Sequence, residues 1–231
     1  MPEAKPSFAK IAFALVYILV FPAILLLLAG DWRWTEGWVF CGWFVALCFT
    51  TIFHLYRHDP ALLAERYKKP GAANQKGWDK YVVYAIQVEF LAWIVLTPLD
   101  ASRYAWSPSF PVWLEALGAV ALLGSSFLFF RAYTDNTFLS PLVRIQSDRK
   151  HHVVSTGVYG FVRHPMYLGA TLMFLGAPTL MGSLVGLAVG AALTGLLAGR
   201  ILGEERMLCA ELDGYAEYQQ RVRYRLIPYV W

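Results

Sequence analysis

Residues 166–202 read MYLGATLMFLGAPTLMGSLVGLAVGAALTGLLAGRIL, an apolar segment interrupted at Gly182-Ser183. The interruption divides the segment into two runs, Met166 to Met181 and Leu184 to Leu202. At about 1.5 Å per residue the first run spans roughly 24 Å, which is shorter than a hydrocarbon core of about 30 Å. The tight join predicts a helical hairpin, which would return its second end to the membrane face where it began.

Glycines recur along this hairpin at intervals of four residues. The first set is Gly182, Gly186 and Gly190, and the second is Gly195, Gly199 and Gly203. Small residues at this spacing allow helix backbones to approach closely inside a membrane. We therefore expect the glycine stripe to lie against neighbouring helices.

The composition indicates a membrane protein. Of the 231 residues, 58% are hydrophobic and only 16% are charged, which is too little charge for the surface of a soluble globule of this size. Four further apolar stretches are candidate spans: Phe8–Ala29, Gly37–Tyr56, Tyr81–Leu96 and Val112–Phe130. The sequence thus predicts an all-α integral membrane fold with about six spans, including the C-terminal hairpin.

Two amphipathic segments are expected at the membrane surface. Asp59-Pro60 favours a short helix to about Tyr67, with Asp59 as its cap and proline in the first turn. The tail from Arg206 favours a helix to about Leu212, a break at Asp213-Gly214 and a second helix through Arg221.

The distribution of basic residues predicts the orientation. If the N-terminus starts inside, the cytoplasmic segments are Lys5 and Lys10, the loops 57–80 and 131–163, and the tail. Of the 20 lysines and arginines only Arg33 and Arg103 then lie outside. This asymmetry follows the positive-inside rule. We expect a multi-pass protein with both termini in the cytoplasm.

Several functional classes are disfavoured by the sequence. The three cysteines form no CxxC pair and no cysteine–histidine cluster of metal spacing, so no metal site is expected. A P-loop, a strand-borne GxGxxG and a Ser/His/Asp pattern are also missing from the sequence, which argues against soluble Rossmann-type cofactor binding. We expect no nucleic-acid partner.

One carboxylate falls inside a predicted span. Glu89 lies near the middle of Tyr81–Leu96, where an ionised carboxylate costs about 3 kcal/mol or more. It must therefore face protein or water, or be neutral. Two interpretations stay open: Glu89 lines a cavity for an acceptor molecule, or it pairs with Arg131 or another polar group.

Residues 157–169, GVYGFVRHPMYLG, lead from a polar loop into the hairpin. Arg163 and His164 precede Pro165, which suits the first turn of a helix. Arg163 can be a membrane anchor, or the pair can bind a carboxylate or phosphate at the helix N-terminus.

Arg200, Glu204 and Glu205 follow where the hairpin re-emerges. Because a hairpin returns to its starting face, this acidic cluster can meet Arg163 and His164. The alternative is an i,i+4 pair of Arg200 with Glu204. A basic pair beside two carboxylates is complementary to a zwitterion such as the amino-acid part of S-adenosylmethionine. The lipid side would then be open to a hydrophobic acceptor.

The same residues carry a family resemblance. The segment from His151 through Gly157 and Tyr159, then the RHPMYLG run, the paired glutamates and Gly214–Val222 with Pro228 together resemble the isoprenylcysteine carboxyl methyltransferase family. They also resemble the broader group that contains the phospholipid N-methyltransferases. The resemblance covers roughly residues 131–231, whereas residues 1–130 match only in hydropathy.

The resemblance implies a single membrane methyltransferase domain over residues 1–231. Residues 1–130 would form the transmembrane scaffold and residues 131–231 the cofactor-binding and catalytic part. The residues implied to surround S-adenosylmethionine are His151, Gly157, Tyr159, Arg163, His164, Tyr167, Glu204 and Glu205. Arg221 would help to orient the acceptor.

The acceptor is left open by the sequence. Ser140-Pro141 replaces an Asn-His pair of the eukaryotic enzymes, so a prenylated cysteine, a phospholipid and a small thiol all stay candidates. A carboxylate acceptor needs no base and would use an arginine, either Arg221 or Arg131. An amine would need deprotonation, for which Glu89, His164 or a tyrosine could serve.

Two other classes compete with a methyltransferase. The ending RVRYRLIPYVW, residues 221–231, also resembles the C-terminal signature of NADPH-dependent sterol reductases, which have more spans than this chain can hold. A small transporter with Glu89 in its pathway is the non-enzymatic alternative. A transporter gives no reason for two charged clusters on one face.

Overall fold

The computed structural model describes the backbone of residues 8–231, and the side chains of residue 12 and residues 14–231. Lys5 and the N-terminus, on which the predicted orientation partly depends, lie outside the described residues, as does the Lys10 side chain. Residues 8–231 form helices and connecting loops, without strands. This agrees with the all-α prediction.

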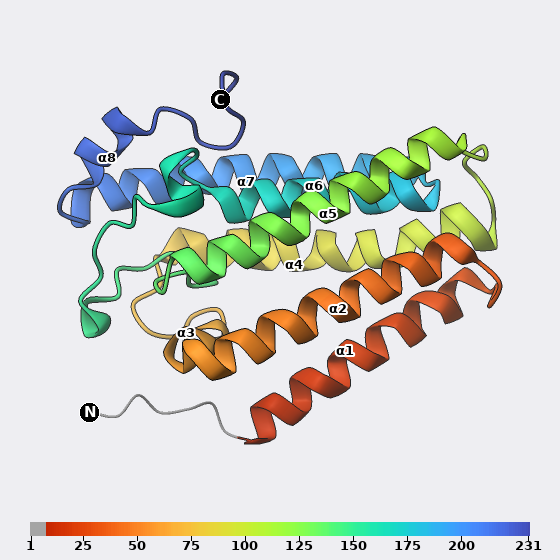
Figure 1. The fold of residues 1–231 in the computed structure, drawn as a ribbon, viewed down its shortest axis with the longest axis horizontal. Helices are drawn as coiled ribbons and strands as arrows, with labels where there is room; N and C mark the ends of the chain where they lie inside the picture. Colours follow the sequence, from red (N-terminus) through yellow and green to blue (C-terminus); the bar gives the residue numbers. More distant parts are fainter. Residues whose placement is uncertain (1–7) are drawn as a thin grey trace.

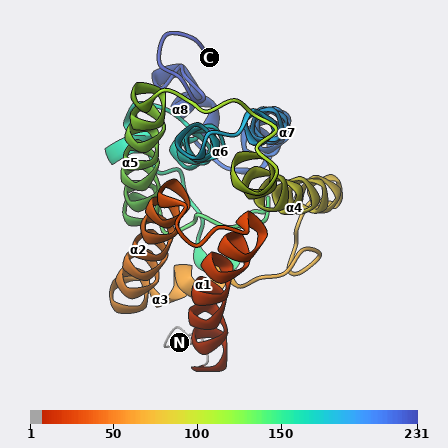
Figure 2. The same cartoon turned by 90° about the vertical axis from the view of Figure 1, so that its right-hand side faces the viewer.

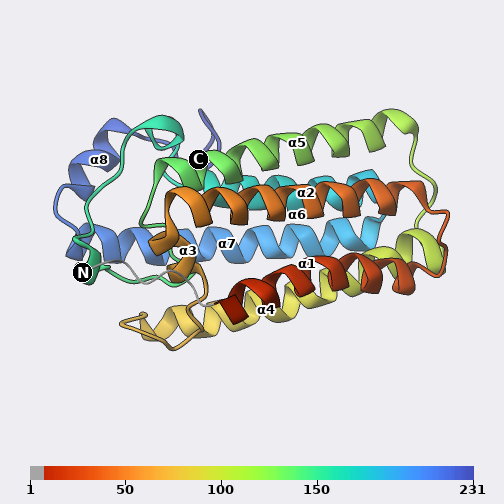
Figure 3. The ribbon, with the colours of Figure 1, turned by 60° about the horizontal axis from the view of Figure 1, so that its bottom comes forward.

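The long helices run lengthwise through the molecule (Figures 1 and 3). They are α1 (Phe8–Ala29), α2 (Thr35–His58), α4 (Gly77–Pro98), α5 (Val112–Asp135), α6 (Pro165–Met181) and α7 (Leu184–Glu211). The short elements are α3 (Pro60–Arg66), a π-helical turn η1 (Leu99–Arg103), the 3₁₀ turns η2 (Ser147–Arg149) and η3 (Gly157–Gly160), and α8 (Tyr215–Arg221).

The two ends of the bundle differ in character. The joins α1–α2, η1–α5 and α6–α7 lie at one end, on the right in Figure 1. At the other end lie α3, α8, and the long loop that contains η2 and η3. Viewed along its length, the bundle places α6 among α2, α4, α5 and α7 (Figure 2). The polar loops that carry the candidate site therefore gather at a single end.

The helices satisfy the requirements of a membrane protein. By length and composition α2, α4 continued by η1, α5 and α7 can each cross a membrane. Within the described side chains, the segment Ala14–Ala29 of α1 and the 17 residues of α6 are apolar but shorter. Many large apolar side chains on the outer faces are exposed, among them Leu91, Val120 and Phe127. Such a surface suits a lipid environment.

The core lies where the six long helices meet. Trp93 of α4 is 1% exposed and packs edge-on against Phe40 of α2 and Phe174 of α6. Its indole nitrogen donates to the Phe174 carbonyl at 3.1 Å. Since a buried indole N–H needs a partner, this bond fixes α4 against α6.

Several predicted helix ends are confirmed and others are wrong. The bounds of α1 agree with the predicted first span, and Asp59 caps α3 by accepting from the Leu62 amide at 2.8 Å. Thr97-Pro98 also ends α4, although the π-helical turn η1 follows it directly. Arg131 does not end α5, and α7 continues nine residues beyond Leu202. The charges at these positions have partners, so they need not leave the helix.

The glycine stripe packs only in part. A side chain at Gly190 would collide with the Phe174 carbonyl, and one at Gly203 would come 2.5 Å from the Trp78 ring. Beside Gly182, Gly195 and Gly199 there is open space, so the prediction is wrong for these three. A four-residue repeat drifts by about 40° per step around an α-helix, and the stripe therefore turns away from a straight neighbour.

Helices α5 and α6 form the most extensive helix contact. Gly118 makes this contact possible, because a side chain there would overlap the backbone nitrogen of Leu180. Ser125 adds a hydrogen bond of 2.8 Å to the Gly169 carbonyl. Through α5, the bundle holds the start of α6, which carries the candidate site.

Candidate functional site

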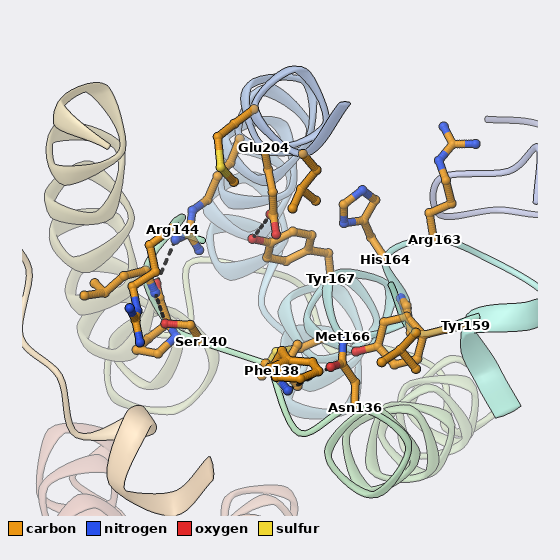
Figure 4. Close-up of a pocket in the computed structure, with 18 of the residues that line it drawn as sticks. Asn136, Phe138, Ser140, Arg144, Tyr159, Arg163, His164, Met166, Tyr167 and Glu204 are labelled. Carbon is orange, nitrogen blue, oxygen red and sulfur yellow. Dashed lines mark hydrogen bonds between the residues drawn. The ribbon is translucent and has the colours of Figure 1, made fainter. Parts of the chain in front are cut away.

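A cavity of about 320 Å³ opens at the end of the bundle that carries α3 and α8. Its wall is built from α3, α4, α5 and the loop after it, and from α6, α7 and α8. Figure 4 shows several of the lining side chains, among them Glu204, Tyr167, Met166 and Phe138, around a common space. Six of the predicted cofactor-binding residues line it: His151, Tyr159, Arg163, His164, Tyr167 and Glu204. We call this space the site cavity.

The basic and acidic clusters meet at this cavity. The Tyr167 hydroxyl donates to Glu204 at 2.7 Å, and the Arg163 Nε donates to Glu205 at 2.6 Å. The His164 Nε2 lies 3.2 Å from the same Glu205 oxygen. The expected contact between segments about forty residues apart is therefore present. The start of α6 and the end of α7 lie on the same side of the bundle.

Glu205 and Arg163 both bind the C-terminal segment. The Arg163 guanidinium also donates to the carbonyls of Val222 and Arg223 at 2.6 and 2.8 Å. Arg225 donates to the second Glu205 oxygen at 2.8 Å. The Arg163 side chain is 5% exposed, and it points away from Glu204 and Tyr167 in Figure 4. These contacts hold residues 222–225 onto α7.

Glu204 has a different environment from its neighbour. It lines the site cavity, and its hydrogen bond comes from the neutral Tyr167 hydroxyl. Among the described side chains no cation forms a salt bridge with it; Arg200 binds Asp79 instead, at 2.7 Å. The alternative i,i+4 pair with Arg200 is therefore not formed. Glu204 places a carboxylate without a salt-bridge partner on the wall, which is suited to a ligand ammonium group.

Two more arginines of the wall are held by buried acids. Arg200 is bound by Asp79 and by the Pro141 carbonyl, and Arg144 by both oxygens of Glu65 at 2.9 Å. Burial alone would raise the pKa of Glu65, but hydrogen bonds from Arg144, Lys68 and Ser140 lower it to about 2. These pairs link α3 and α4 to the loop after α5.

Sequence reasoning missed this network. Asp79 and Arg200 are 121 residues apart, and Glu65 and Arg144 are 79 apart. An acid just before a span and an arginine in a loop both look like ordinary interfacial residues. No local pattern signals such long-range pairs.

Two titratable groups of the wall, His151 and Tyr159, are held neutral. Burial, followed by the charges of His152, Arg144 and Arg149, lowers the pKa of His151 to about 4. Burial also raises the pKa of Tyr159, whose ring is 5% exposed. At neutral pH His151 is therefore an uncharged imidazole and Tyr159 an uncharged phenol. Both can hydrogen-bond a ligand without adding charge.

The remaining predicted residues do not line the site cavity. Gly157 has φ +58°, and Asp135 fills the space that a side chain would need there. Asp135 accepts from the Val158 amide at 2.9 Å and pairs with Arg131 at 2.8 Å, so the suggested Arg131–Glu89 pair is not formed. Arg221 is exposed at the end of α8. One oxygen of Glu89 is buried without a hydrogen-bond partner.

Fold and site together define a helical membrane protein with a partly polar cavity at one end of its bundle. A family model described as phospholipid methyltransferase matches residues 114–211. The chain is 33% identical over 85 residues to a protein-S-isoprenylcysteine O-methyltransferase of Schizosaccharomyces pombe, over 36% of each chain. It is 28% identical over 138 residues to protein-S-isoprenylcysteine O-methyltransferase B of Arabidopsis thaliana, over 58% of this chain and 66% of that one.

The chain thus matches less than two thirds of the length of these relatives. A solved structure of a eukaryotic intramembrane Ras methyltransferase, an isoprenylcysteine carboxyl methyltransferase, has a similar fold. The TM-score is 0.54 at 22% identity, over 95% of this chain and 77% of that chain. The resemblance to the isoprenylcysteine carboxyl methyltransferase family is confirmed by these comparisons.

Proposed function

We propose that this protein is a membrane-embedded methyltransferase that uses S-adenosylmethionine to methylate the carboxylate of a lipid-modified cysteine. The observation that carries the proposal is the position of Glu204. Its carboxylate faces the site cavity without a cationic partner, while the neighbouring acid and three wall arginines are already paired. The names of the matched relatives supply the acceptor class.

The site cavity fits the cofactor by size and chemistry. Its volume of about 320 Å³ lies within the range of small-molecule pockets. Glu204 would bind the ammonium group, and neutral His151 and Tyr159 would hydrogen-bond the polar edges. Phe138 and Met166 offer apolar surface for the adenine ring (Figure 4). When bound, S-adenosylmethionine supplies a methyl group that its positive sulfur has already activated.

The other implied residues would support this site indirectly. Glu205 holds Arg163 and His164, and through them the C-terminal segment. Gly157 leaves room for Asp135 to bind the Val158 amide, which fixes the turn that carries Tyr159. These residues shape the wall, whereas Arg131, Arg221 and Glu89 lie outside it.

A carboxylate acceptor places few demands on the protein. The carboxylate oxygen is already a nucleophile at neutral pH, so no proton has to be removed. The protein has to bind the acceptor, align it and exclude water. The paired arginines form a preorganised part of the wall for this purpose.

The second candidate acceptor is a phospholipid amine. The match of residues 114–211 to the phospholipid methyltransferase model favours it. An amine has to lose a proton before it attacks, and the uncharged imidazole of His151 on the wall could accept one. The acceptor assay below separates the two candidates.

We further propose that six helices cross the membrane as a single domain, with residues 1–130 as scaffold and residues 131–231 as catalytic part. The termini and the site would then be cytoplasmic. Arg33 and Arg103 belong to the joins at the opposite end, which supports this orientation. The α6–α7 pair would act as the hairpin that returns Glu204 to the cytoplasmic face.

Ligand binding to the detergent-purified protein tests the proposal. We expect binding of S-adenosylmethionine and S-adenosylhomocysteine but not of NADPH, by calorimetry. Glu204→Gln should weaken binding about 10- to 100-fold, because a charge-assisted hydrogen bond is lost. Glu211→Gln is the matched control, since Glu211 lies on the same helix and binds Lys76 at the surface. Wild-type affinity in Glu204→Gln would show that Glu204 does not bind the cofactor.

Methyl transfer from a labelled donor then identifies the acceptor. We expect label in a prenylated cysteine with a free carboxylate, and none in phosphatidylethanolamine. The reverse result would select the phospholipid N-methyltransferase. NADPH binding without S-adenosylhomocysteine binding would replace both with a reductase.

A further inference from the structure

A second cavity of about 280 Å³ lies beside the site cavity, among α1, α2, α3 and α5. Its wall is almost entirely apolar and includes Leu47, Cys48, Ile52, Leu55 and Leu63. We call it the tail cavity. Arg66 and Phe129 belong to the walls of both cavities, so these two side chains stand where the two spaces adjoin.

Arg66 differs from the other arginines of the site cavity in having no anionic partner. Arg144, Arg163 and Arg200 are bound by Glu65, Glu205 and Asp79 respectively. The Arg66 guanidinium lies 5.4 Å from the centre of the Tyr133 ring, and within the described chain it forms no salt bridge or hydrogen bond. Arg66 is only partly exposed. It is therefore the arginine of this wall that is free to bind an incoming anion.

The position of Arg66 also indicates which kind of molecule carries the anionic group. On one side is the site cavity, where Glu204 would hold the cofactor ammonium, and on the other is apolar space. A water-soluble anion would leave the tail cavity unused. A molecule with a long apolar chain and an anionic head fills both, with its head beside the guanidinium.

We propose that Arg66 is the binding residue for the carboxylate of the methyl acceptor, and that the apolar chain of the acceptor occupies the tail cavity. This inference rests on the proposed function and names the residue that selects its acceptor. One carboxylate oxygen accepts a hydrogen bond from Arg66 and the other stays free to form the new bond to the methyl carbon. The donor sulfur takes the electron pair of the broken sulfur–methyl bond, and no proton is released.

The test uses two probes that differ only in the head group: N-acetyl-S-farnesylcysteine and its carboxamide. Their dissociation constants are measured with the purified full chain, by calorimetry and without turnover. Wild-type protein should prefer the carboxylate about 10- to 100-fold. Arg66→Gln should abolish the preference by weakening the binding of the carboxylate probe alone. Arg66→Lys should retain part of the preference.

Arg57→Gln is the matched control. Arg57 also lies over an aromatic ring, 5.0 Å from the centre of Phe53, but it lines neither cavity. This variant should behave as wild type with both probes. S-adenosylhomocysteine binding should be unchanged in both arginine variants. Weaker S-adenosylhomocysteine binding in Arg66→Gln, with the probe preference intact, would assign Arg66 to the cofactor and overturn the proposal.

A cavity-filling variant tests the tail cavity independently. Cys48→Phe should weaken the binding of the farnesyl probe by roughly four-fold for each methylene that is excluded from the cavity. It should leave a probe with a short alkyl chain unaffected. Equal effects on both chain lengths would contradict the placement of the chain. Because these measurements need no methyl transfer, failure of the proposed activity and failure of the Arg66 assignment give different results.

Discussion

Replacement by glutamine should have different effects at the adjacent acids: it should lower stability at Glu205 and weaken cofactor binding at Glu204. Glu205 is 4% exposed and bridges Arg163, His164 and Arg225. In Glu205→Gln these bases lose their shared negative charge. We therefore expect a loss of stability and a loosened C-terminal segment.

The magnitude follows from the burial of the pair. Breaking a buried ion pair by removing one partner costs about 3 to 5 kcal/mol. The glutamine oxygen still accepts a bond, and Arg163 keeps its two carbonyl contacts, so we expect a value near the lower limit of about 3 kcal/mol. For a chain of this length Tm changes by about 2 to 4 °C per kcal/mol, which gives a decrease of about 6 to 12 °C.

Thermal unfolding in detergent and limited proteolysis of the C-terminal segment measure the effect. Glu204→Gln serves as the comparison, because glutamine can still accept the bond from Tyr167. Its Tm should stay within about 2 °C of wild type while cofactor binding falls. The double variant Glu205→Gln/Arg163→Met should recover part of the stability, since no buried charge is left unpaired. If Glu205→Gln leaves both Tm and proteolysis unchanged, the assignment of Glu205 to the C-terminal segment is refuted.

Three further predictions concern stability. Gly118→Ala should destabilise the protein by about 2 kcal/mol because α5 and α6 are in contact there, whereas Gly195→Ala, beside open space, should be neutral or stabilising by up to about 1 kcal/mol in thermal unfolding. Because the pKa of Glu65 falls from 4.5 to about 2 on folding, its contribution of roughly 3 kcal/mol should be complete above pH 4.5 and lost between pH 4.5 and 2; Glu65→Gln should flatten Tm against pH in that window. Asp79→Asn should lower Tm more than Asp79→Asn combined with Arg200→Met, because the single variant leaves a buried guanidinium without its anion.

The fold was predictable where hydropathy alone determines it. The bounds of α1, α6 and α8 follow from apolar runs and from proline or glycine at their ends. The end of α5 was not predictable in this way, and neither was the continuity of the hairpin helix with the predicted helix after Arg206, because charged residues there continue the helix. A charge looks like a helix end only while its partner is unknown, and the partner of Arg200 lies in α4.

The candidate site was predictable as a meeting of two clusters but not as a division of roles. The basic pair at Arg163 and the acidic pair at Glu205, on either side of the hairpin, predicted which segments approach each other. The cavity wall also depends on α3 and on the loop after α5, whose sequences read as ordinary polar connections. Arg66 had no signal of its own, since its importance comes from the pairing of every other arginine around the site cavity.

The geometry of one helical turn explains why the paired acids must divide their roles. Successive residues on an α-helix point about 100° apart, so Glu204 and Glu205 cannot both face the same small molecule. One faces the site cavity and the other faces the C-terminal segment. Both sit on the same rigid turn of α7. The position of the Glu204 carboxylate and the docking of residues 222–225 are therefore set together. A substitution that loosens that segment should therefore weaken cofactor binding without touching the cofactor, and the Tm comparison of the two glutamine variants separates this indirect loss from a direct one.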